Sequence, residues 1–189
     1  QLIIRNINHL QERLSTKWPI ASIVYRDRYI CSPLNARLLS EVIKGLNKFY
    51  GKFNSSVSIT LEMVDTVKET YQKSSYLHHD WQKREDRNEV IKSLLSISGC
   101  KIILNERHYN QTQHARDLTL IWADGVRLIL RLDHGLGFLR CKTITPFNFE
   151  EEASEQSKKI SALKFDIKNN MAQQGVYFYL TDISRTTLM

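Results

Sequence analysis

The feature that most constrains the fold is the order in which strand-like and helix-like segments alternate along the chain. The apolar run Ile20–Tyr25 predicts a buried strand, and apolar residues spaced three and four apart in Leu34–Tyr50 predict a long amphipathic helix. The same order returns with a strand at 57–63 and a helix at 80–98, and another strand follows at 100–104. Because strands joined through a helix usually pair in parallel, these segments predict an α/β fold.

A hairpin makes the predicted sheet a mixed one. Residues alternate between apolar and polar in Leu118–Trp122 and again in Val126–Leu132, and the intervening Asp124-Gly125 is a strong hairpin signal. A helix from about residue 151 and a final strand at 176–180 follow. We therefore predict an α/β protein with a mixed β-sheet flanked by helices.

The chain is expected to form a single domain over residues 1–189, with a leading helix over residues 1–18. Its 189 residues suit one domain, and no linker or internal repeat divides them. A content of 42% hydrophobic and 25% charged residues excludes the disordered and low-complexity classes. Because the sequence starts with Gln1 rather than Met, we expect the domain to be cut from a longer polypeptide.

The sequence also predicts a reducing, cytoplasmic location. It has no signal peptide and no apolar run of the roughly 20 residues that a membrane-spanning helix needs. The three cysteines, Cys31, Cys100 and Cys141, are far apart and odd in number, which disfavours a disulfide framework. We expect them to be small apolar residues of the interior.

Positive charge is concentrated in two blocks of the sequence. The formal net charge is +7, and residues 1–52 hold nine basic and three acidic residues, whereas residues 101–142 hold seven and four. If the two blocks meet in space, they form a basic face that attracts phosphate. The alternative is that these lysines and arginines are simply solvated.

The first candidate site is Arg26-Asp27-Arg28-Tyr29, directly after the first strand. Ligands collect beyond the carboxyl ends of strands in α/β sheets, and two guanidinium groups and a phenol there can hold phosphate oxygens. Asp27 would orient one of the arginines. The alternative is a surface pair of Arg26 with Asp27, which contributes little.

The second candidate site flanks the hairpin. His114 and Arg116 are two residues apart, so on a strand their side chains share one face. A histidine beside a cation can grip a phosphate or act as a nucleophile. His134 precedes Gly135-Leu136-Gly137, whose glycines either let backbone N–H groups approach an anion or form a tight turn, and Lys142 adds a further cation.

Taken together, these motifs resemble the phospholipase D-like C-terminal domain of MIT-domain proteins. The resemblance is carried by the Asp27–Ile30 segment after a strand, the later His114-x-Arg116, the Asp124-Gly125 turn and the Gly135–Phe138 stretch. It implies a phospholipase D-like fold and a basic face that binds acidic membrane lipids. Active phospholipase D-like enzymes use His-x-Lys with a further Asp, whereas this chain has Arg116 in place of Lys and only one copy of the motif.

We therefore predict a non-catalytic module that binds the phosphate backbone of nucleic acid, without a cofactor or metal. It would belong to a larger nucleic-acid-processing or bacterial defence protein. The expected phosphate contacts are Arg26, Arg28, Tyr29, His114, Arg116, His134 and Lys142. Three alternatives stay open: a peripheral module that binds acidic phospholipids, a phospholipase D-type nuclease with His114 as nucleophile, and a scaffold for protein partners.

Two further patterns are weaker. His78-His79-Asp80 contains metal-ligating residue types, but adjacent histidines point apart on a helix and no partner at the usual spacing follows, so we expect no metal site. Trp18, Tyr25, Tyr29 and Trp122 are able to stack on bases, although such residues more often pack in a core or at its rim.

Overall fold

The computed structural model describes residues 10–28, 30, 32–51, 53–65, 81, 83–96, 99–111, 116–132, 135–136, 147, 149–170 and 176–181. For Tyr109 and for residues 167–170 and 176–181 it describes the backbone alone. Within these ranges, no helix combines the length and the apolar character that crossing a membrane requires.

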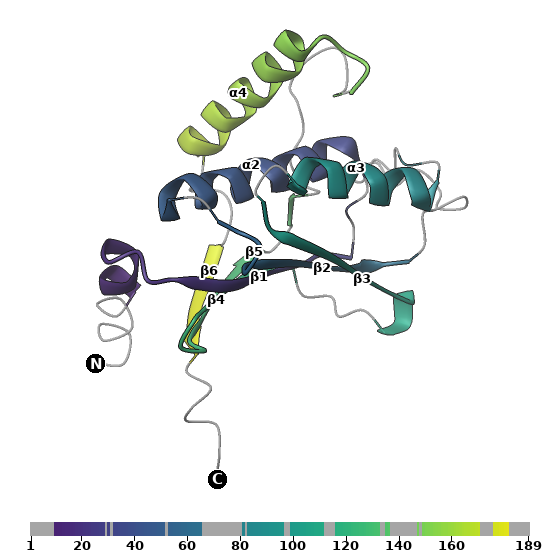
Figure 1. Cartoon of the computed structure of the whole chain (residues 1–189). Helices are drawn as coiled ribbons and strands as arrows, with labels where there is room; N and C mark the ends of the chain where they lie inside the picture. Colours follow the sequence, from purple (N-terminus) through teal and green to yellow (C-terminus); the bar gives the residue numbers. More distant parts are fainter. Residues whose placement is uncertain are drawn as a thin grey trace.

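Six strands form one mixed sheet in the order β3-β2-β1-β4-β5-β6 (Figure 1). They are β1 (Ile20–Arg26), β2 (Ser58–Val64), β3 (Lys101–Arg107), β4 (Asp117–Trp122), β5 (Arg127–Leu132) and β6 (Val176–Thr181). β1, β2 and β3 pair in parallel, whereas the pairs β1–β4, β4–β5 and β5–β6 are antiparallel. The carboxyl ends of β1, β2, β3 and β5 therefore meet the amino end of β4 at one end of the sheet, which we call the Asp27 end.

Two helices cover one face of the sheet and a third lies beyond them (Figure 1). α2 (Pro33–Tyr50) and α3 (Arg84–Ser96) pack on the sheet, and α4 (Ala153–Asn170) lies outside α2. α2 begins where the Ser32 hydroxyl accepts a hydrogen bond from the backbone N–H of Asn35, and it ends at Gly51, whose φ is 86°. A short 3-10 helix, η1 (Tyr109–Gln111), follows β3.

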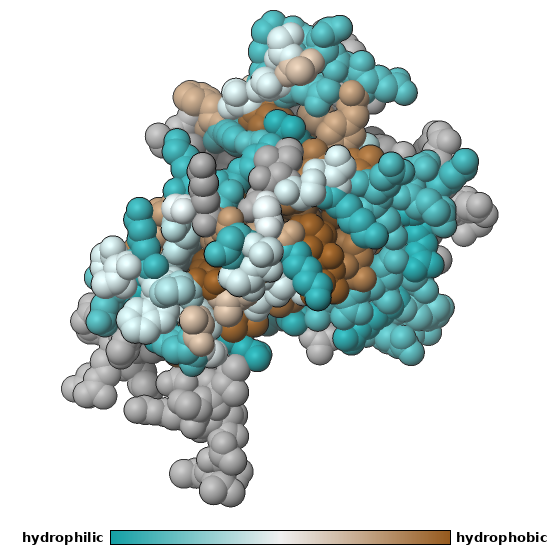
Figure 2. Space-filling model, viewed as in Figure 1, coloured by the Kyte–Doolittle hydropathy of each residue, from teal (hydrophilic) through white to brown (hydrophobic). Residues whose placement is uncertain are grey.

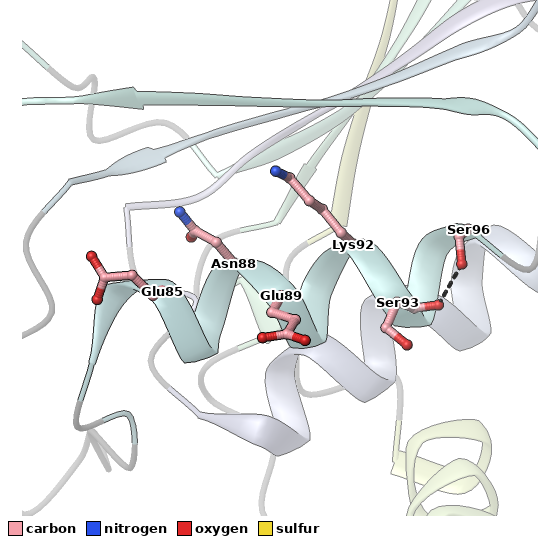
Figure 3. A pocket seen from close by; sticks show the side chains of 6 residues that line it. All are labelled: Glu85, Asn88, Glu89, Lys92, Ser93 and Ser96. Atoms are coloured by element: carbon pink, nitrogen blue, oxygen red, sulfur yellow. Dashed lines mark hydrogen bonds between the residues drawn. The ribbon is translucent and has the colours of Figure 1, made fainter.

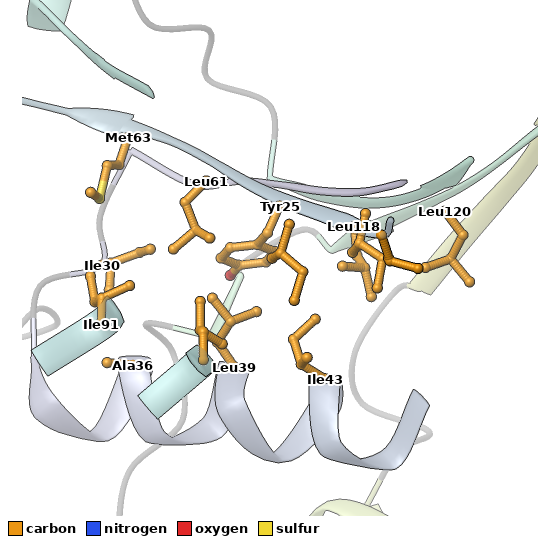
Figure 4. Packing of buried hydrophobic residues seen from close by; sticks show 14 of the residues in the cluster. Tyr25, Ile30, Ala36, Leu39, Ile43, Leu61, Met63, Ile91, Leu118 and Leu120 are labelled. Atoms are coloured by element: carbon orange, nitrogen blue, oxygen red, sulfur yellow. The ribbon is translucent and has the colours of Figure 1, made fainter. Parts of the chain in front are cut away.

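The core lies between the helix layer and the sheet. Ile23 of β1 and Ile43 of α2 are at most 1% exposed and belong to one cluster of buried apolar residues. Figure 4 shows Ile43 packed with other members of this cluster. Figure 2 shows hydrophobic residues between the helices and the sheet and a hydrophilic surface over α3. A second cluster joins α2 to α4 and consists of Leu34, Leu38, Phe147, Ile160 and Leu163. The predicted α/β fold with a mixed sheet flanked by helices is confirmed.

Two predicted boundaries were wrong. We expected the third strand to end at residue 104, but β3 continues through Arg107 because Asn105, Glu106 and Arg107 pair in register with Glu62, Met63 and Val64 of β2. β3 is an edge strand, where polar side chains are tolerated. The third predicted helix is also shorter than expected, since α3 starts at Arg84.

Of the leading helix expected over residues 1–18, the structure describes residues 10–18, and of these residues 10–15 are helical. Cys100 is partly buried and packs against the main core, and Cys31 and Cys141 lie outside the described residues.

Candidate functional site

The Asp27 end of the sheet is organised around one buried carboxylate. Asp27 is 1% exposed, although it directly follows β1. The Tyr25 hydroxyl donates a hydrogen bond to Asp27 Oδ2 at 2.9 Å, and Arg116 Nε lies 3.7 Å from Oδ1. A buried carboxylate is costly unless it is paired and hydrogen-bonded, so these contacts fix both Tyr25 and Arg116.

The pKa of Tyr25 reflects this environment. Burial raises it well above its ordinary value of 10.0, and the neighbouring negative charge of Asp27 raises it further. The opposing effect of the Arg116 guanidinium is smaller. The phenol therefore stays protonated and keeps donating to Asp27.

Gly135 closes the site from the loop after β5. Its φ is 60°, and a Cβ at this position would lie 2.5 Å from Asp27 Oδ2 and 2.8 Å from Arg116 Cδ. Both the backbone conformation and the space therefore require glycine. The backbone carbonyl of the next residue, Leu136, accepts a hydrogen bond from Asn35 Nδ2 of α2 at 2.9 Å. The glycine pattern noted in the sequence thus forms a tight turn at Gly135.

The structure brings two of the predicted phosphate contacts to this end and separates the third. Arg116 is held by Asp27, and Arg28 follows Asp27 in the chain and is 9% exposed. Arg26 points to the opposite face of the sheet, since neighbouring residues of a strand alternate. There its guanidinium pairs with Glu62 at 2.6 Å and with Asp117 at 3.2 Å.

The pairing of Arg26 has a consequence for its charge. Burial lowers the pKa of Arg26, but the hydrogen bond and charge of Glu62 and the charge of Asp117 outweigh burial and raise it overall. The side chain is therefore a cation neutralised by two carboxylates, and it has little capacity left for phosphate. The other predicted contacts, Tyr29, His114, His134 and Lys142, lie outside the described residues, as does His78-His79-Asp80.

Sequence reasoning missed Arg131. It lies one residue before the end of β5, is exposed, and stands in register with Asp117, the residue after Arg116. The signal was present, because the alternation Leu128, Leu130, Leu132 places Arg131 on the polar side of its strand. Finding its neighbours required the register between β4 and β5.

A shallow depression on α3 does not resemble a ligand site. It is lined by polar side chains of that one helix, namely Glu85, Asn88, Glu89, Lys92, Ser93 and Ser96 (Figure 3). Convergent groups from several elements, which a small-molecule site needs, do not line it. Within the described ranges, no three His, Cys, Asp or Glu side chains gather as metal ligands would.

Comparison with known proteins decides the family. A family model described as the C-terminal domain of the DEAD/DEAH box helicase YjiV matches residues 1–182. The chain belongs to this family. No curated protein matches it.

Membership of the YjiV C-terminal family overturns the resemblance drawn from the sequence. The interpretation as a phospholipase D-like C-terminal domain of an MIT-domain protein was wrong. Its motif pieces have local explanations in the structure. Asp124-Gly125 is the turn of the β4–β5 hairpin, with Gly125 at φ 85°, and Gly135 turns the chain against Asp27. Short turn motifs recur in unrelated folds, because many folds need the same turns.

Proposed function

We propose that this domain is a non-catalytic module that binds the phosphate backbone of nucleic acid and serves a DEAD/DEAH box helicase of which it forms a part. The observation that carries the proposal is that Asp27, the residue before Arg28, pairs with Arg116 at one end of the sheet, although the two arginines come from distant parts of the sequence. The helicase family favours nucleic acid over the acidic membrane lipids that the earlier resemblance implied.

The chemistry of this end suits a phosphate backbone. Asp27 holds Arg116 near its Nε, and the Arg116 side chain keeps 23% of its surface exposed. Because its Nε end is held in place, the guanidinium presents its remaining N–H donors in a defined direction, which suits bidentate contact with phosphate oxygens. Arg131 adds an exposed cation at the same end of the sheet but on its opposite face, because it is in register with Asp117, which pairs with Arg26. A nucleic-acid backbone that crosses the end of the sheet can contact both arginines. Phosphate contacts carry no sequence information, so the proposed binding is largely independent of sequence and sensitive to salt.

We leave Arg26 out of the proposed interface because two carboxylates neutralise it. Tyr29, His114, His134 and Lys142, which lie outside the described residues, stay in the proposal as contacts predicted from the sequence. In this arrangement His114 binds rather than attacks, since the arginine two residues after it is already engaged by Asp27.

The test is a salt series of binding to fluorescein-labelled DNA, measured by anisotropy. The variant Arg116→Gln/Arg131→Gln removes two proposed phosphate contacts, so the slope of log K against log salt should become shallower by about 1.8 on duplex DNA. The matched control Lys83→Gln/Lys92→Gln removes the same charge from exposed positions at and just before α3 and should leave the slope close to that of the wild type. Equal effects of the two double variants would overturn the proposed interface.

Two further measurements serve as controls for this experiment. Because Arg116 also pairs with Asp27, Arg131→Gln alone should lower the slope by about 0.9 without disturbing the buried carboxylate. The same DNA, analysed on denaturing gels, should stay intact. Cleavage that disappears in His114→Ala would refute the non-catalytic part of the proposal.

A further inference from the structure

Two exposed aromatic residues lie at the end of the sheet opposite Asp27. Trp18 is 42% exposed and Phe49, in the last turn of α2, is 44% exposed. Single exposed apolar residues are common and need no explanation. These two are linked, however, because Lys17, the residue before Trp18, places its Nζ 5.9 Å from the centre of the Phe49 ring. We call Trp18 and Phe49 with Lys17 the aromatic platform.

Trp18 is held in place from the inside. The Arg13 guanidinium lies 5.4 Å from the centre of the Trp18 ring and 5.1 Å from that of the buried Trp122. Arg13 also donates two hydrogen bonds to Asp124 in the β4–β5 hairpin, at 3.1 and 2.7 Å. Its contacts therefore tie Trp18 to the core and to the hairpin. Rings that are fixed before a ligand arrives lose little conformational entropy on binding.

Lys17 occupies a position that normally belongs to glycine. Trp18 N–H bonds the Arg13 carbonyl at 3.0 Å and Lys17 N–H bonds the Leu14 carbonyl at 3.3 Å, which is the Schellman pattern at the end of a helix. This pattern needs a left-handed residue, and Lys17 has a φ of 51°. Among the residues that the structure describes, Lys17 is the one non-glycine residue whose φ is positive. A left-handed backbone is less favourable for lysine than for glycine, but Lys17 places an ammonium group beside the exposed Phe49 ring.

The surrounding charge indicates the class of ligand. Lys17 lies over the Phe49 ring, the exposed Lys48 shares the last turn of α2 with Phe49, and Arg13 is already paired with Asp124. Exposed aromatic rings with nearby cations bind single-stranded nucleic acid, because unpaired bases stack on the rings while the cations meet the phosphates. Bases inside a duplex are already stacked on each other and present only their edges.

We propose that the aromatic platform stacks bases of single-stranded nucleic acid. This inference rests on the proposed function and adds the strand state of the ligand to it. The platform is separate from the Asp27 end, since Ile20 pairs with Trp122 at one end of β1 and Arg26 pairs with Asp117 at the other. The seven residues of β1 separate them by roughly 20 Å. The two sites can therefore be removed independently.

The test compares an oligothymidine with a duplex of equal length, by anisotropy, for the wild-type chain and its variants. Trp18→Ala and Phe49→Ala should each weaken binding of the single strand by about 5- to 150-fold, which corresponds to the usual worth of one base–aromatic stack. Both variants should weaken duplex binding less than twofold. The matched control Phe165→Ala removes an aromatic ring that is 68% exposed on α4 and should change neither affinity by more than twofold.

A second variant keeps the test valid if removing Trp18 disturbs the fold. Lys17→Gly removes the ammonium but suits the left-handed backbone, so it should unfold at the same or a higher temperature while weakening single-strand binding. Unchanged single-strand affinity in Trp18→Ala, Phe49→Ala and Lys17→Gly would overturn the inference. If Arg116→Gln/Arg131→Gln still weakens binding in that case, the proposed function stands; a wild-type chain that binds no DNA removes both.

Discussion

Replacing Gly135 by alanine is the sharpest perturbation of the Asp27 end. The new Cβ would lie 2.5 Å from Asp27 Oδ2 and 2.8 Å from Arg116 Cδ, while φ stays at 60°. Neither neighbour can move freely, because Asp27 is 1% exposed and holds both Tyr25 and Arg116. The substitution therefore strains the backbone and also displaces the buried carboxylate.

The expected loss of stability has two parts. A left-handed conformation costs alanine about 1–2 kcal/mol relative to glycine. Displacing Asp27 from the Tyr25 hydroxyl weakens a buried hydrogen bond to a charged group, which costs about 1–3 kcal/mol more. We therefore expect Gly135→Ala to lower the free energy of unfolding by about 2–5 kcal/mol.

Gly125→Ala supplies the control for this experiment. Gly125 also has positive φ, at 85°, but a Cβ there would meet nothing within 4 Å. It should lose only the backbone part, about 1–2 kcal/mol. Urea unfolding followed by circular dichroism measures both variants under the same conditions. Equal losses in the two variants would show that Gly135 does not press on Asp27, and the described geometry of the site would be refuted.

Three further predictions concern single groups. Tyr25→Phe removes the donor to Asp27 and should cost about 1–3 kcal/mol in urea unfolding; a cost below about 0.5 kcal/mol would mean that Asp27 does not need this donor. The pKa of Glu106 lies below its ordinary value of 4.5, because burial, which raises it, is outweighed by hydrogen bonds from Arg84 and Asn88 and by nearby arginine charge. Glu106 therefore stabilises the fold above about pH 4.5 and loses this contribution as the pH falls through its lower folded pKa, so Glu106→Gln should flatten the acid limb of a stability–pH curve, and an unchanged limb would contradict the assignment. Ser32→Ala removes the hydroxyl that caps α2 and should cost about 1 kcal/mol, whereas Ser32→Asp should restore most of the loss; no difference between them would argue against the cap.

Much of the fold could be predicted from the sequence because its apolar periodicities are strong. The alternation in Leu118–Trp122 and the spacing in Leu34–Tyr50 correspond closely to β4 and α2. The polar end of β3 could not be predicted in this way, because it depends on pairing with β2 and on Glu106, which binds Arg84 and Arg87 of α3. Arg84 and Arg87 lie about 20 residues before Glu106 in the sequence, and no local pattern identifies them as its partners.

The candidate site could likewise be predicted only in part. The rule that ligands collect beyond strand ends pointed to Asp27 and Arg28, and the structure adds that Arg116 meets them there. Arg26 was placed with them because it is adjacent in sequence. Its pairing with Glu62 and Asp117 depends on the register of three strands, which sequence alone does not give.

The most direct test of the central claim is a footprint of bound DNA by hydrogen–deuterium exchange on the whole chain. We predict that a saturating DNA oligonucleotide slows exchange of backbone amides at residues 26–30, 114–117 and 131–136, the sequence stretches around Asp27, Arg116 and Gly135, which lie together at the Asp27 end. Slower exchange confined to α3, or no change at residues 26–30 and 114–117 in a chain that is saturated with DNA, would contradict the account.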